Sequence, residues 1–113
     1  MHKRRANKTY QKVRLLSLAT PRVRKHIIRD ADESLINVVS ECCLNLLKGH
    51  VPLTAKQKSR LSKHKKSLRK LAERGVGVRK RKKILIQSGS GLLPALLVPV
   101  AALLGRLLSH GTN

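Results

Sequence analysis

The chain has 113 residues, of which 26 are lysine or arginine and five are acidic, giving a formal net charge of +21. Tyr10 is its only aromatic residue, so any core must be small and aliphatic. The length limits the fold to one modest domain with tails. So large a positive charge predicts a polyanionic partner, either nucleic acid or an anionic membrane surface. The lack of aromatic side chains disfavours recognition of single strands by base stacking.

The cysteines and histidines do not form a recognisable catalytic or metal-binding pattern. Cys42 and Cys43 are adjacent, so on a helix they point about 100° apart and are poorly placed to bridge each other. His50 would add only one further ligand, and we expect buried or half-buried thiols in a reduced compartment, no metal site and no cofactor. The sequence contains no paired carboxylates, phosphate-binding loop or nucleophile arrangement with suitable spacing. We therefore expect no catalytic residues and no enzymatic activity.

The first third of the chain predicts a basic arm followed by a short helix. Residues 1–19 are rich in lysine and arginine, and the L-L-S-L-A run at their end favours a first short helix; a disordered basic tail up to Thr9 is the alternative. Thr20 followed by Pro21 is typical of an N-cap and first helical residue. This second helix is expected to end near Arg29.

Residues 30–48 predict the central core helix. They hold four of the five acids, and three of these fall where a first helical turn would favour anions. Apolar residues recur every three or four positions and form a wide face: Leu35, Ile36, Val38, Val39, Cys42, Cys43, Leu46 and Leu47. Gly49 is expected to end the helix as a C′ glycine.

Residues 54–83 carry most of the charge, with 14 lysines or arginines and one acid. Thr54 and Gln57 form the pattern of a capping box, which predicts one helix to about Ala72 or Arg74. A narrow apolar stripe would leave the cations on the outside, where they are expected to contact phosphates rather than bases. The predicted nucleic-acid-binding residues are Lys56, Lys58, Arg60, Lys63, Lys65, Lys66, Arg69, Lys70, Arg79, Lys80, Arg81, Lys82 and Lys83.

The character of the chain changes after Lys83. Residues 84–91 are expected to be a linker because of their Gly and Ser content, and residues 92–113 form a hydrophobic tail interrupted by proline and glycine. A core helix, a transmembrane span and a kinked membrane-active segment all fit this tail; the third is preferred because the helical region offers too little apolar surface to cover it. The expected membrane-interacting residues are Leu92, Leu93, Leu96, Leu97, Leu103 and Leu104.

Together these patterns predict an all-α fold. It would be a small basic helical bundle or hairpin over residues 20–83, with a basic N-terminal arm and a hydrophobic, Gly/Pro-broken C-terminal segment.

The order of the motifs resembles a family of viral proteins. The run N-L-L-K-G-H-V-P-L-T-A-K-Q-K-S-R-L-S-K-H-K-K-S-L-R-K-L-A is followed by a Lys/Arg cluster, I-L-I-Q and L-L-P-A-L-L. This order resembles the small basic proteins of Polinton (Maverick) and adintovirus-like elements, which have been compared with adenovirus core and minor capsid proteins. The resemblance covers roughly Leu35 to Leu108. It implies a virion-associated protein, found in the virion and the host nucleus, with double-stranded DNA and capsid proteins as partners.

Three functions remain in competition on the sequence alone. The first is a non-catalytic, sequence-independent DNA-binding virion protein that neutralises nucleic acid and perturbs membranes through its tail. The second is an RNA-binding protein of the ribosomal type, which would explain the charge but not the tail. The third is a membrane-lytic peptide precursor, which would explain the tail but not the capped helices. The first hypothesis is preferred because it accounts for both features.

Overall fold

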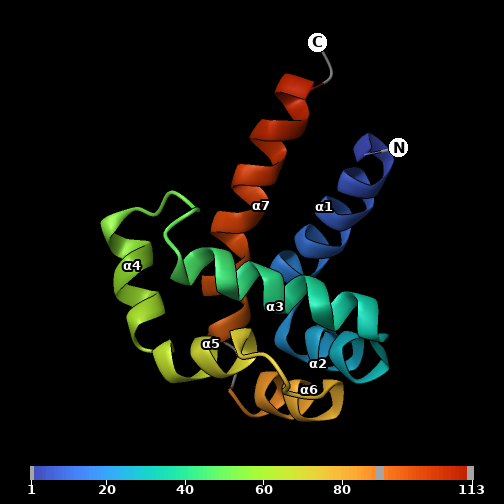
Figure 1. The fold of residues 1–113 in the computed structure, drawn as a ribbon, viewed down its shortest axis with the longest axis vertical. Coiled ribbons are helices and arrows are strands. Elements are labelled where there is room, and N and C mark those ends of the chain that lie inside the picture. Colours follow the sequence, from blue (N-terminus) through green and yellow to red (C-terminus); the bar gives the residue numbers. More distant parts are fainter. Residues whose placement is uncertain (1, 89–90, 112–113) are drawn as a thin grey trace.

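The computed structural model describes residues 2–88 and 91–111, and all the regular structure in these residues is helical (Figure 1). The all-α fold class predicted from the sequence is confirmed for this part of the chain. The helices, in chain order, are α1 (His2–Leu18), α2 (Pro21–Asp30), α3 (Glu33–Leu47), α4 (Ala55–Ser62), α5 (Lys65–Ala72), α6 (Val78–Gln87) and α7 (Leu92–Gly111).

The hydrophobic C-terminal segment is the central element of the core. In Figure 1, α7 passes behind α3 and runs upward beside α1. Leu92, Leu96 and Leu97 are fully buried, and Leu93 retains only 5% of its exposure. The preferred interpretation of a membrane-active tail therefore differs from the structure, in which the tail is a core helix. The apolar surface that covers this helix comes largely from α1, which packs along α7 and contributes Val13 to the core.

Two further features differ from the sequence-based prediction: the prolines do not interrupt the C-terminal helix, and the linker before it is short. Helix α7 continues without a break from Leu92 to Gly111. Pro94 lies in its first turn, where a missing N–H costs nothing, and Pro99 is inside the helix. The expected linker at residues 84–91 is shorter than predicted, because α6 continues to Gln87. Its apolar residues cause the extension, since Leu85 is buried against the core.

Helices α1 and α7 approach each other closely near Tyr10. A Cβ atom added to Gly105 would lie 3.5 Å from the Tyr10 hydroxyl oxygen, in ordinary contact. The segment expected to be an arm with a short helix is thus a helix of 17 residues whose second half packs on α7.

Helix α3 has defined caps at both ends. The Asp32 carboxylate accepts the Leu35 N–H at 2.9 Å, which fixes the start. At the other end Gly49 adopts φ +78°, and the N–H groups of Gly49 and His50 donate to the carbonyls of Leu46 and Asn45 at 3.1 and 2.9 Å. This pair of bonds defines a Schellman motif, so the predicted C′ glycine is confirmed.

The basic segment forms two helices where one was predicted. Its capping box is confirmed, because the Gln57 N–H donates to Thr54 Oγ1 at 3.1 Å and the Thr54 N–H donates to Gln57 Oε1 at 2.9 Å. A tight turn at Lys63 and His64 then separates α4 from α5. The turn allows α4 to pack on α7 while α5 packs on α3.

The radius of gyration is 13.4 Å, close to the value of about 13 Å for a folded chain of 100 residues. This agreement shows that α7 is folded into the molecule and does not project as a tail. Over the described residues, no single helix has the length and hydrophobicity to cross a bilayer, and only α6 and α7 taken together meet these criteria, with an angle of 107° between them.

Candidate nucleic-acid interface

Helices α4, α5 and α6 follow one another around one edge of the molecule. Figure 1 shows α4 at the left, α5 below it and α6 at the bottom. Buried leucines hold these helices to the core, with Leu61 on α4, Leu68 and Leu71 on α5, and Leu85 on α6. Because each helix turns a narrow apolar stripe inward, its cations are directed outward.

Most of the predicted nucleic-acid-binding residues are exposed along this edge. We call the exposed set the basic edge; it consists of Lys56, Lys58, Arg60, Lys63, Lys65, Lys66, Arg69, Arg79, Lys80 and Lys83. The three remaining predicted residues, Lys70, Arg81 and Lys82, are half-buried.

Two of these three half-buried cations hold helix ends together. Lys82 Nζ donates to the carbonyl oxygen of Arg29 at 2.9 Å, in the last turn of α2. Arg81 Nη2 donates to the carbonyl oxygen of Glu73, the C-cap of α5, at 2.9 Å. Terminal carbonyls of a helix carry partial negative charge and lack intrahelical partners. These two cations therefore complete the fold, a role that charge alone could not reveal in the sequence.

The basic edge carries little compensating negative charge. The one salt bridge among the described residues joins Lys70 Nζ to Glu73 Oε2 at 3.6 Å, and the two side chains are 43% and 56% exposed. An exposed pair of this kind stabilises the fold weakly, by about 0–1 kcal/mol. The acids of α3, including Glu33 and Glu41, lie instead in a groove between α3 and α7. The cations of the basic edge are thus free to bind an external anion.

Sequence reasoning missed a second group of cations on α2. Arg22, Lys25 and Arg29 are exposed, and α2 packs beside α6. Figure 1 places α2 next to α6 at the lower end of the molecule, so these side chains extend the basic edge. The short basic amphipathic pattern of residues 21–29 was the signal that could have identified them.

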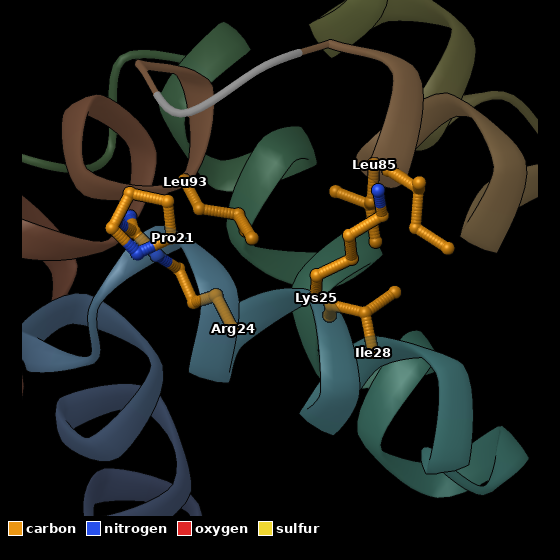
Figure 2. A pocket seen from close by; sticks show the side chains of 7 residues that line it. Pro21, Arg24, Lys25, Ile28, Leu85 and Leu93 are labelled. Carbon is orange, nitrogen blue, oxygen red and sulfur yellow. The ribbon is translucent and has the colours of Figure 1, made fainter.

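Figure 2 shows a cavity of about 200 Å³ enclosed by α2, α6 and α7. Its walls are mostly apolar and include Ile28, Leu85 and Leu93. In this view the Arg24 side chain runs toward Pro21, away from Leu85. Arg24 is only 7% exposed, burial lowers the pKa of its guanidinium, and Nη1 has no hydrogen-bond partner among the described residues. Since the guanidinium points toward Pro21 and the walls are mostly apolar, the cavity itself is a packing gap between helices.

A second hollow, of about 370 Å³, lies on the surface between α4 and the beginning of α7. Arg60 and Lys63 line it, as does His64, whose ring lies against Gly91. The cations of this hollow belong to the basic edge, so it forms a recess within the same surface.

The cysteines are buried thiols. Burial, with a smaller contribution from the neighbouring Glu41 carboxylate, raises the pKa of Cys42 to about 12. Burial also raises the pKa of Cys43, which is fully inaccessible. The described residues contain no cluster of three or more His, Cys, Asp or Glu side chains that could hold a metal ion. Both thiols are therefore protonated near neutral pH.

The six leucines expected to contact membranes divide into two groups. Leu92, Leu93, Leu96 and Leu97 are buried in the core. Leu103 and Leu104 are half-buried and line the groove between α3 and α7. In this conformation the leucines do not form a common surface that a membrane could contact.

Comparisons with protein-family models, with curated proteins and with solved structures found no match to this chain.

Proposed function

We propose that this chain is a non-catalytic, sequence-independent DNA-binding protein that neutralises the charge of nucleic acid. The observation that carries the proposal is the basic edge, in which ten exposed cations lie on three consecutive helices and the turn at Lys63, around one side of the fold. A surface with so much uncompensated charge attracts a polyanion, because each neutralised phosphate releases a condensed counterion.

The side chains of the basic edge favour contact with phosphates. Lysine and arginine dominate the exposed faces of α4 and α5, whose sequences are A-K-Q-K-S-R-L-S and K-K-S-L-R-K-L-A. Phosphate contacts fix the position of a protein on a duplex but carry no sequence information. We therefore expect similar affinities for unrelated duplexes.

Salt dependence provides the first test. Binding to two unrelated DNA duplexes would be measured at several salt concentrations. The logarithm of the affinity should fall linearly with the logarithm of salt, with a slope of about −0.9 for each phosphate contacted. Strong discrimination between the duplexes, or a flat response to salt, would contradict the proposal.

Matched variants locate the interface. Lys66→Gln combined with Arg69→Gln removes two exposed cations of α5 and should reduce the magnitude of the slope by up to about 1.8. Arg106→Gln is the control, since it removes an exposed cation of α7 away from the basic edge. If Arg106→Gln lowered the slope by half as much as the double variant, which is the same loss for each charge removed, binding would follow total charge and not this surface.

The virion setting remains part of the proposal and rests on the motif order. In that setting the protein would be packed with genomic double-stranded DNA, beside capsid proteins, and would occur in the virion and the host nucleus. A gene for a major capsid protein or packaging ATPase next to its reading frame would support this setting. A ribosomal setting would instead be favoured by tighter binding to structured RNA than to duplex DNA at equal salt.

A further inference from the structure

Exposed apolar side chains lie along a shallow hollow where α1 meets α2. Leu15, Leu18 and Val23 are 57%, 71% and 47% exposed, although aliphatic side chains of this size are mostly buried in folded proteins. Leu15 and Leu18 are three residues apart on α1, so they project side by side. The exposed cations Arg14 and Arg22 flank them. We call these three apolar residues the leucine ridge.

The groove between α3 and α7 has the opposite character. It encloses about 930 Å³, and Val38, Cys42, Val100, Leu103 and Leu104 provide its apolar lining. Its remaining lining includes Glu33 and Glu41, two of only five acids in the chain. We call this feature the acidic groove.

We infer that the leucine ridge of one copy of this chain docks into the acidic groove of a second copy. The apolar residues of the ridge match the apolar lining of the groove, and burial of both would favour association. The cations beside the ridge match the carboxylates of the groove. Elsewhere the surface is strongly cationic, so two copies repel each other in most other orientations, and complementary charge selects this one.

The ridge and the groove are different surfaces, so the contact is head-to-tail. Each copy that uses its ridge retains a free groove, and the contact propagates unless rotation closes a ring. Neither surface includes a residue of α4, α5 or α6, so every copy in such a chain keeps the ten cations of its basic edge accessible, and only Arg22 of the extension on α2 lies at the contact. The inference concerns association between proteins, and its test in the absence of nucleic acid is independent of the proposed function.

The mass of the wild-type protein would be measured by analytical ultracentrifugation over a range of concentrations, without nucleic acid. A salt concentration of about 0.15 M limits long-range repulsion, because the Debye length is then about 8 Å. The average mass should rise continuously with concentration. A monomer that persists to about 1 mM, corresponding to less than about 4.1 kcal/mol of association, would overturn the inference and leave the groove to a different partner.

Two variants each disable one side of the contact. Leu18→Asp places a charge on the ridge, and Glu41→Arg reverses a charge in the groove. Both side chains are exposed, so the circular dichroism melts should remain close to that of the wild type. Each variant alone should associate at least about tenfold more weakly, a loss of about 1.4 kcal/mol. The controls are Val98→Asp, an exposed apolar site on α7, and Glu73→Arg, an equal charge reversal outside both surfaces.

A mixture of the two variants distinguishes a head-to-tail contact from a symmetric one. In an equimolar mixture, the intact ridge of Glu41→Arg can meet the intact groove of Leu18→Asp, while the other two surfaces are disabled. The mixture should therefore form dimers and nothing larger. If the mixture remains monomeric, or if the control variants weaken association as much as the test variants, the inference is wrong.

Discussion

Lys82 Nζ lies 2.9 Å from the carbonyl oxygen of Arg29, 53 positions earlier in the chain. The ammonium group of a highly basic run thereby stabilises the C-terminal end of α2 and joins it to α6. The neighbouring Lys83 is exposed and belongs to the basic edge. Adjacent lysines in one sequence run thus have different roles, one within the fold and one on its surface.

This difference gives the first prediction. Lys82→Met removes a charged hydrogen bond and should lower the free energy of unfolding by about 1.5–3 kcal/mol, with little change in DNA affinity. Lys83→Met should change stability by less than about 0.5 kcal/mol but reduce the salt slope by about 0.9. Urea unfolding and salt-dependent DNA binding, measured on both variants, test this prediction. Identical behaviour of the two variants would contradict the assignment of separate roles.

The second prediction concerns the C-terminal helix. A fragment that ends at Gln87 lacks α7 and the buried Leu92, Leu96 and Leu97, so it should lose its cooperative thermal melt by circular dichroism. DNA binding should weaken as well, because α4 would no longer pack on α7. A fragment that still melted cooperatively would show that α7 is not part of the core.

Point variants test the same helix in the full chain. Leu96→Asp places a charge in the core and should destabilise the fold by several kcal/mol. Val98→Asp is the matched control on the same helix, since Val98 is 44% exposed, and it should cost less than about 1 kcal/mol. Comparable melting temperatures for the two variants would contradict the position of α7.

The third prediction concerns the glycines that flank the basic helices. Gly49 has φ +78°, and a Cβ atom added there would meet nothing within 4 Å, so Gly49→Ala should destabilise by about 1–2 kcal/mol through backbone strain alone. Gly77 caps α6 with φ −71° and without a side-chain hydrogen bond. Gly77→Ser should therefore stabilise, by about 0.5–1 kcal/mol, through a new cap and a less flexible unfolded chain. In thermal melts, the midpoint of Gly49→Ala should therefore lie below that of the wild type, and the midpoint of Gly77→Ser above it.

The fourth prediction concerns the buried thiols and alkaline pH. The pKa of Cys42 rises from 9.0 to about 12 on folding. Between these two values the unfolded state has lost a proton that the folded state retains, so stability falls as pH rises, by up to about 1.4 kcal/mol per pH unit for a thiol. Below pH 9 both states are protonated and this contribution is constant.

The alkaline effect is isolated by a matched variant. Lysines also lose charge in this range, so the wild type would be compared with Cys42→Ala, which carries the same lysines. The difference in unfolding free energy between the two proteins should change steadily from pH 9 to pH 11 in the direction that disfavours the wild type. A pH-independent difference would show that Cys42 is accessible in the folded state.

Features set by neighbouring residues could be predicted from the sequence. The caps at Thr20, Thr54 and Gly49 depend on hydrogen bonds between residues at most five positions apart, and each has a specific residue pattern. The existence of the central helix α3 and the exposure of most of the predicted nucleic-acid-binding residues followed from hydrophobic periodicity. These parts of the fold and of the interface required no knowledge of distant contacts.

Features that depend on distant contacts could not be predicted in the same way. Whether α7 is covered depends on the total apolar surface offered by every other helix, and α1 was not counted because its basic composition favours an arm. The inward roles of Arg81 and Lys82 depend on carbonyls at Glu73 and Arg29 that only the folded chain brings near. The turn at Lys63 and His64 likewise follows from α4 and α5 packing on different helices.

The most extensive helix pair in the molecule joins α1, the first element, to α7, the last. Synthesis proceeds from α1 towards α7, so α1 leaves the ribosome before its partner has been made. The core therefore cannot close until α7 is available. Contacts between such distant segments also slow folding, because a long loop must close before they form. A chain with a charge of +21 spends this interval with its leucines uncovered, and transiently exposed apolar surface of this kind promotes aggregation.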